Sequence, residues 1–190
     1  MKEGLIKDTY ELILKEIQTV ITASYIIAVG IGMLFNYQKY SEFGINIFNY
    51  SDVFDFLIAP FSDFYILLFA TASILFVSII FKLDTLWKDK WPKSYSKINF
   101  GCDKKSWFKT YRTVLIIISF VLYLYQSADF YGRYTKDKII IQNDISIKLA
   151  DNEIKSGKLI GKTKDVIFLL NDEKVYAIPI SSLVKEIRIK

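Results

Sequence analysis

Few side chains in this chain have the types and spacing that catalysis requires. The 190 residues include no histidine and one cysteine, Cys102, so the commonest general base and the commonest metal ligand are both missing. Cys102 precedes Asp103, Lys104 and Lys105, and lysine charges can lower the pKa of a nearby thiol and make it nucleophilic. A loop cysteine without a chemical role is the alternative. The sequence predicts a protein that is not an enzyme and uses no metal or cofactor.

Polar side chains near apolar segments are the second place where the sequence suggests chemistry. Ser119 and Gln126 lie within a long apolar run, and Asp129 follows directly after it. Polar and ionisable groups inside a membrane often belong to a transport pathway. The alternative places Asp129 at the membrane surface, where a carboxylate costs little free energy.

Three uncharged apolar runs must position these side chains. They are Ile17–Phe35, Phe64–Phe81 and Thr113–Ala128, in a chain that is 52% hydrophobic with a mean hydropathy of +0.26. About 20 helical residues cross a hydrocarbon core of about 30 Å, so the runs predict a transmembrane domain at residues 1–133. Its spans are expected at about residues 14–36, 63–83 and 110–131, with an interfacial segment at 45–60.

Small residues recur every four positions in the first run, at Ser24, Ala28 and Gly32. This spacing places them on one helix face, where small side chains allow close packing against another helix in a membrane. The partner is either a helix of the same chain or a second copy of the protein.

The loops predict the orientation of the chain. Residues 82–112 are rich in lysine, whereas residues 36–63 contain a single basic residue, Lys39. Short basic loops stay in the cytoplasm, so we expect a cytoplasmic N-terminus and an extracytoplasmic C-terminal domain. Basic residues just after the third run favour the opposite side for that domain.

The lysine-rich loop is also expected to lie at the lipid headgroups, because aromatic rings and lysines anchor there. The residues concerned are Trp87, Trp91, Trp107, Lys104 and Lys105. The net charge of +5 is spread over loops and tail, a distribution that predicts no nucleic-acid partner.

The segment at residues 45–60 is too apolar for a free loop and too charged to span a membrane. Its pattern predicts a short amphipathic helix that Ser51 or Asp52 caps and that Pro60 ends. Such a helix either seals the bundle at the membrane surface or forms a re-entrant segment or ligand lid.

Residues 134–190 change to alternating apolar and polar positions, which are typical of strands. The predicted strands are Lys138–Gln142, Ile145–Leu149, Gly157–Gly161, Asp165–Leu170, Lys174–Ile180 and Val184–Ile189. Residues 171–173 are predicted to form a tight hairpin turn, Pro179 to lie at an edge or a bulge, and Ile180–Leu183 to form one 3₁₀ turn.

This arrangement of short strands resembles a small SH3-like or Sm-like barrel. The stretches from Gly157 to Leu170 and from Ile178 to Ile187 carry the resemblance, and they are similar to the tails of small bacterial multi-span membrane proteins. Together with the three apolar runs, the resemblance predicts an α+β membrane protein, with three transmembrane helices followed by a small all-β C-terminal domain at residues 134–190. It implies no functional residues.

These observations predict a non-enzymatic protein of the bacterial inner (cytoplasmic) membrane. We expect its helices to anchor it in the lipid bilayer and to form a homo-oligomer, and its β-module to bind a small ligand or a protein partner. An oligomeric channel or transporter, or a membrane-perturbing effector, is the alternative, because serine and threonine side chains in the runs can line a path through an oligomer.

Overall fold

Three long helices dominate the computed structural model, which describes the backbone of residues 2–180 and 184–188 and the side chains of residues 16–180 and Glu186. The long helices are α1 (Lys2–Ser41), α3 (Phe64–Lys90) and α5 (Phe108–Ile141). The described residues also form the shorter helices α2 (Val53–Ser62) and α4 (Pro92–Ile98), with 3₁₀ turns at Ile47–Asn49 and Cys102–Lys104. Three helical segments are long and apolar enough to cross a membrane: Glu16–Ser41, Phe64–Lys90 and Phe108–Ile141. The three predicted helices are therefore confirmed, and their length and composition indicate a membrane protein.

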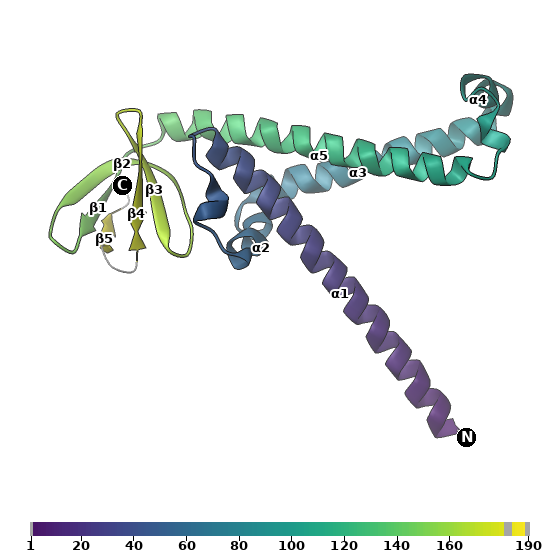
Figure 1. The fold of residues 1–190 in the computed structure, drawn as a ribbon, viewed down its shortest axis with the longest axis horizontal. Helices are drawn as coiled ribbons and strands as arrows, with labels where there is room; N and C mark the ends of the chain where they lie inside the picture. Colours follow the sequence, from purple (N-terminus) through teal and green to yellow (C-terminus); the bar gives the residue numbers. More distant parts are fainter. Residues whose placement is uncertain (1, 181–183, 189–190) are drawn as a thin grey trace.

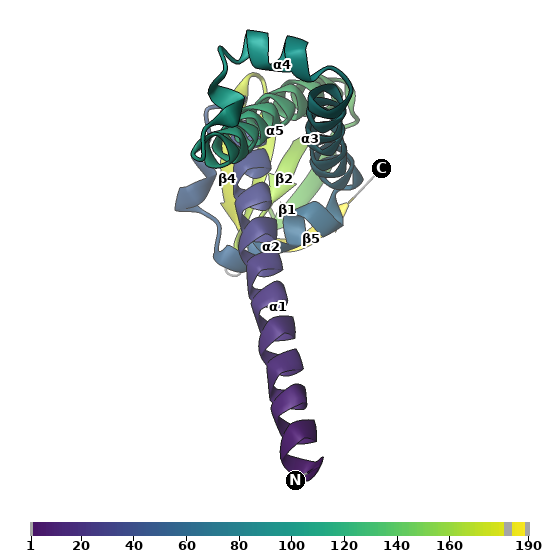
Figure 2. The same cartoon turned by 90° about the vertical axis from the view of Figure 1, so that its right-hand side faces the viewer.

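The long helices are arranged as a hairpin crossed by a single helix. Helices α3 and α5 run antiparallel and side by side, whereas α1 crosses them and continues away from the rest of the molecule (Figures 1 and 2). Side chains 16–27 of α1 are all exposed. This stretch of the helix therefore packs against none of the other described elements, and its apolar side chains face outward on every side.

The helices meet in an apolar core where α1 crosses the hairpin. Phe35 of α1, Ala128 and Tyr131 of α5 and Ile66 of α3 have exposed fractions of 1% or less. Further along the hairpin, the rings of Phe76 and Tyr123 stack with centroids 4.4 Å apart. Apolar contacts thus hold α3 and α5 together along their length.

The C-terminal part of the chain forms a five-stranded antiparallel sheet with the order β4-β3-β2-β1-β5. The strands are β1 (Ile145–Leu149), β2 (Ile154–Lys162), β3 (Val166–Asn171), β4 (Lys174–Pro179) and β5 (Val184–Arg188). On β1, the buried residues Ile145, Ile147 and Leu149 alternate with Ser146 and Lys148, which is the period of two expected for a strand. Five of the predicted strands are confirmed.

Two local features of the sheet follow the sequence prediction. Asp172 and Glu173 both have positive φ, 46° and 63°, in a two-residue turn between Asn171 and Lys174, which face each other across the hairpin. Pro179 is the last residue of β4, which is an edge strand. The predicted 3₁₀ turn falls mainly on residues 181–183, outside the described residues.

The predicted strand at Lys138–Gln142 is wrong, because helix α5 continues to Ile141. Ile139 is buried while Ile140 and Ile141 are exposed. Consecutive isoleucines favour strands by propensity. Here the burial of Ile139 against the helix ends and the sheet outweighs that local preference, so the helix extends beyond its apolar run.

A second apolar core, the junction core, joins the sheet to the helices. It is formed by Tyr40, Ile45, Ile47, Phe56, Ile139, Ile160 and Phe168. The Phe168 ring of β3 lies edge-on to Tyr40 of α1 and to Tyr50, with centroids 5.4 and 5.3 Å apart. The sheet is thus packed directly on the end of the helical part where α1, α2 and α5 meet (Figure 1).

Candidate functional site

A cavity of about 600 Å³, the junction cavity, opens where the helices meet the sheet. Its walls come from the end of α1, helix α2, the start of α3, helix α5 and the turn between β2 and β3. Its charged and phenolic lining includes Lys39, Asp55, Asp63, Tyr131, Lys162 and Lys164. Cavities of this size are typical of small-ligand sites.

Helix α2 forms one wall, and its N-terminal cap ties it to the sheet. The Asp52 carboxylate accepts hydrogen bonds from the backbone N–H groups of Phe54 and Asp55, at 2.8 and 3.0 Å. The Asp55 carboxylate accepts from the backbone N–H of Asp52 at 3.1 Å, completing a capping box. It also accepts from the backbone N–H of Lys164 at 3.1 Å. The predicted Asp52 cap is confirmed, whereas Pro60 lies inside a helix that ends at Ser62.

Asp63 connects α3 to α5 at the base of the cavity. Its carboxylate caps α3 by accepting from the backbone N–H of Tyr65 at 2.9 Å, and it accepts a 2.6 Å hydrogen bond from the Tyr131 hydroxyl. This contact links the start of α3 to the C-terminal half of α5. The charge of Asp63 therefore serves the protein's own hydrogen bonds.

The lysines of the cavity form no close ion pairs. Among the described residues, no carboxylate lies within ion-pair distance of Lys39, Lys162 or Lys164, although Asp63 is near enough to Lys39 for an electrostatic interaction. The Lys39 ammonium lies 5.2 Å from the centroid of the Tyr40 ring. It also lies 3.1 Å from where a Cβ atom on Gly161 would sit. These ammonium groups are free to donate hydrogen bonds to an anionic group in the cavity.

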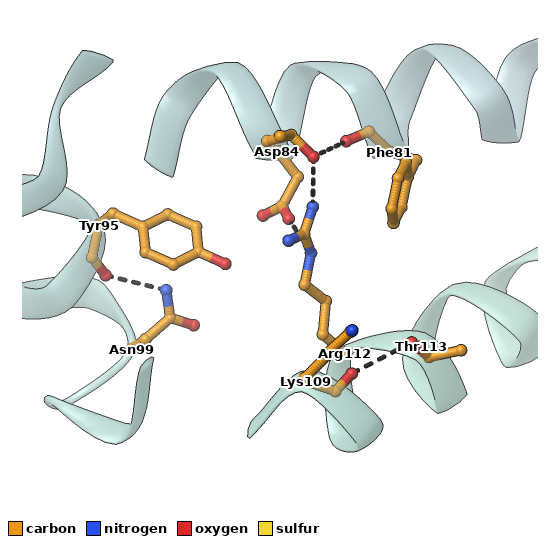
Figure 3. A network of polar contacts seen from close by, with 8 residues as sticks. Phe81, Asp84, Tyr95, Asn99, Lys109, Arg112 and Thr113 are labelled. Carbon is orange, nitrogen blue, oxygen red and sulfur yellow. Dashed lines mark hydrogen bonds and ion pairs between the residues drawn. The ribbon is translucent and has the colours of Figure 1, made fainter. Parts of the chain in front are cut away.

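A polar cluster at the opposite end of the hairpin, the loop-end cluster, joins α3 to α5 and α4. Arg112 of α5 pairs with the Asp84 carboxylate of α3, donates a 2.6 Å hydrogen bond to the Thr85 hydroxyl, and lies 4.8 Å from the Phe81 ring centroid. Figure 3 shows Arg112 reaching between Asp84 and Phe81, with Tyr95 of α4 alongside.

Tyr95 packs the loop between α3 and α5 against this cluster. Its side chain is 2% exposed, and the rings of Trp87 and Phe108 lie edge-on to it, with centroids 5.5 and 6.3 Å away. Burial raises the pKa of the Tyr95 hydroxyl, and the nearby Asp84 carboxylate raises it further. The lysine-rich loop is therefore folded onto the end of the hairpin.

The predicted helix-packing residues have different surroundings. Gly32 is buried, and a Cβ atom there would lie 1.8 Å from the carbonyl oxygen of Phe56. Ala28 is half-buried and Ser24 is exposed. The end of the stripe near Gly32 therefore packs against α2 of the same chain, while Ser24 faces outward.

The predicted membrane-interface residues gather at the α4 end of the hairpin. Trp91 and Trp107 are 55% and 48% exposed, and the ammonium groups of Lys90 and Lys105 lie 5.1 and 5.9 Å from their ring centroids. Lys104 is exposed, whereas Trp87 packs inward on Tyr95. Their contact with lipid stays a prediction.

The predicted intramembrane polar residues do not meet in a site within this chain. Ser119 and Gln126 are exposed on α5, and Asp129 forms an ion pair with Arg133 one turn further along the same helix. Cys102 is a half-buried free cysteine in the α4–α5 loop. Within the described part of the chain, no group of carboxylates and cysteines has the spacing of a metal site.

The sequence reasoning missed the residues that line the junction cavity and the Arg112–Asp84 pair. One signal was present: Asp63 directly precedes an apolar run, which is the position of an N-cap. Lys39 and Lys164 are far apart in sequence and carry no pattern that relates them.

No family model, curated protein or solved structure matches this chain.

Proposed function

We propose that this chain is a non-enzymatic, multi-span protein of the bacterial inner membrane. Its helices anchor it and self-associate, and its β-domain binds a small ligand or a protein partner beside the membrane. The observation that carries this proposal is the direct packing of the sheet on the helix ends, where the junction cavity lies between them. A ligand bound there contacts both parts of the protein at once.

The spacing of polar groups along the hairpin supports membrane insertion. At about 1.5 Å per residue, the stretch of α3 from Asp63 to Asp84 is about 32 Å long. The stretch of α5 from Arg112 to Tyr131 is about 29 Å long by the same rise. Both lengths match a hydrocarbon core of about 30 Å, so the loop-end cluster and the junction cavity fall at opposite membrane surfaces.

The arrangement of the loops supports an extracytoplasmic β-domain. Helix α2 has ten residues and is too short to cross a membrane. The Asp55 carboxylate bonds to the backbone of Lys164, so the α1–α3 connection and the sheet share one side. The lysine-rich α4 loop lies at the other end (Figure 1), and the positive-inside rule assigns that end to the cytoplasm.

Self-association is proposed from the outer surface of α5. Gln126 is exposed there and forms no hydrogen bond within the described residues. It lies about 7.5 Å along the helix from Tyr131, inside the apolar segment. A lone amide in hydrocarbon costs free energy, and pairing with a second copy of the chain satisfies it.

An SH3-like or Sm-like barrel is proposed for the β-domain. Strand β5 pairs with β1, on the far side of the sheet from β4, and β2 is long enough to pair with β1 over its first half and β3 over its second. A long shared strand of this kind lets a sheet bend toward closure. Folds of this type host many functions, so the barrel itself assigns none.

Cysteine labelling tests the membrane topology. In a Cys102→Ser background, Lys104→Cys marks the α4 loop and Lys174→Cys marks the exposed β-domain edge. In intact bacterial cells a membrane-impermeant maleimide is expected to react with the cysteine at 174, and with that at 104 only after permeabilisation. The reverse pattern overturns the orientation. Recovery of the protein in the aqueous fraction without detergent overturns the membrane assignment.

An oligomeric channel is the second candidate, favoured by the exposed Ser119 and Gln126 on one surface of α5. Several other hydroxyls in the spans bond within their own helices, as Ser78 does to the carbonyl of Ile74 at 2.7 Å. The Ser127 hydroxyl of α5 instead contacts the Ser73 hydroxyl of α3 at 3.4 Å, inside the hairpin. Purified protein in liposomes should conduct ions if these side chains line a pore, and Gln126→Leu should abolish the flux. Flux equal to that of empty vesicles contradicts the channel.

A further inference from the structure

The junction cavity combines three ammonium groups that form no ion pair with the described residues and carboxylates that already accept hydrogen bonds. Asp52, Asp55 and Asp63 each accept two hydrogen bonds from the protein itself, mostly from backbone N–H groups. Helix N-termini stabilise such carboxylates. Lys39, Lys162 at the end of β2 and Lys164 in the β2–β3 turn keep their donor capacity, so the complementary ligand is an anion with several acceptor oxygens.

The three lysines come from two separate parts of the fold, and the backbone that carries them is held in fixed relation. Lys39 is half-buried near the end of α1. The β2–β3 turn is fixed by hydrogen bonds of the Thr163 side chain to the backbone of Val166 and by the contact of Lys164 with Asp55. Lysine side chains from the helical part and from the sheet can therefore contact the same anion in the cavity.

The cavity also opens beside apolar surface. Phe54 and Ile58 of α2 line it and are 66% and 57% exposed. Phe61, further along the same helix, is 72% exposed. A soluble anion gains nothing from such neighbours, whereas a molecule with an anionic head and apolar tails buries them.

We propose that the junction cavity binds the headgroup of an anionic phospholipid. The phosphate lies among Lys39, Lys162 and Lys164, and the acyl chains run along the apolar face of α2. This inference rests on the proposed membrane location, which places the cavity at the level of the headgroups. Phosphate is the shared chemistry of a lipid headgroup and of a free phosphate ester, and the apolar mouth favours the lipid.

Native mass spectrometry of the full chain in detergent tests the proposal. The probes are phosphatidylglycerol, phosphatidylcholine with the same acyl chains, and free glycerol phosphate. We expect retention of phosphatidylglycerol in preference to phosphatidylcholine. The double variant Lys162→Gln/Lys164→Gln alters two exposed side chains at the end of β2 and in the following turn, and each lost charge is expected to weaken binding about fivefold.

The matched control is Lys155→Gln/Lys174→Gln, which removes the same charge from the β-domain outside the cavity, and it should retain the lipid. Lys39→Gln should weaken retention further, and if that variant does not fold, the turn variant decides. Equal retention of the two lipids, or equal loss in the control, overturns the proposal. Displacement of phosphatidylglycerol by glycerol phosphate at equal concentration overturns the lipid assignment. If the protein needs detergent for extraction but shows no preference for phosphatidylglycerol, the lipid inference is wrong and the proposed membrane location stands.

Discussion

Replacement of Gly32 by alanine is the sharpest test of how α1 and α2 pack. The added Cβ atom would lie 1.8 Å from the carbonyl oxygen of Phe56 and 2.7 Å from its carbonyl carbon. Both atoms belong to the backbone, so no side-chain rotation relieves the contact. Because Cβ contacts shorter than 3.0 Å essentially do not occur, α2 must move away by about 1.2 Å.

The size of the effect follows from overpacking a buried contact. Such insertions cost about 1–3 kcal/mol, and a clash with backbone belongs at the upper end. Alanine also gains about 1 kcal/mol of helix propensity over glycine. The net loss of unfolding free energy for Gly32→Ala is therefore about 2 kcal/mol, the difference of these two estimates.

Gly30→Ala is the matched control, because it makes the same chemical change two residues earlier in α1, where no atom lies within 4 Å of the new Cβ. Both variants gain the same helix propensity, so their free energies of unfolding should differ by the cost of the clash alone, about 3 kcal/mol. At about 2–4 °C per kcal/mol, this is about 6–12 °C in thermal midpoint, measured from tryptophan fluorescence in detergent. Equal midpoints for the two variants would refute the close approach of α1 and α2.

Three further changes test the caps and the loop-end cluster. Asp52→Ala removes the acceptor at the start of α2 and should lower stability by about 1 kcal/mol, measured by the same thermal assay. Arg112→Gln should also lower stability by about 1 kcal/mol, because the ion pair with Asp84 is partly exposed. In a double-mutant cycle with Asp84→Asn, the two stability losses should be coupled, and additive losses would contradict the ion pair. The raised pKa of Tyr95 means that the neutral phenol stabilises the folded state. That contribution is complete below its ordinary pKa of 10.0 and is lost as the pH rises above it. Alkaline unfolding should therefore be less steep for Tyr95→Phe, and an unchanged pH profile would contradict its burial.

Local patterns predicted most of the elements. The apolar runs predicted α1, α3 and α5, and turn residues between alternating segments predicted the hairpin of β3 and β4. Each of these signals lies within a short stretch of chain, so neighbouring residues suffice to read it. The end of α5 was the exception, because Ile139 is buried in the junction core, which residues from distant segments form.

The candidate site depended on long-range contacts and was not predictable in the same way. The junction cavity is built from five separate segments, and the role of Lys39 is set by the approach of β2 at Gly161. Gly32 was predicted to pack against a helix of the same chain or of a second copy, and the segment containing α2 was predicted to seal the bundle or to form a re-entrant segment or lid, but no local pattern related the two. Pairing of Asp84 with Arg112 required the antiparallel alignment of α3 and α5, which no local signal supplies.

The α3–α5 hairpin has a consequence for the kind of bilayer that suits this chain. Its polar ends are separated by the length of the two helices, and the Asp63–Tyr131 and Asp84–Arg112 contacts keep these helices aligned. A helix does not shorten under load. In the proposed membrane location, a bilayer of another thickness must therefore deform or the hairpin must tilt, at a cost of fractions of a kcal/mol per Å of mismatch. We therefore expect the hairpin to favour membranes of one thickness.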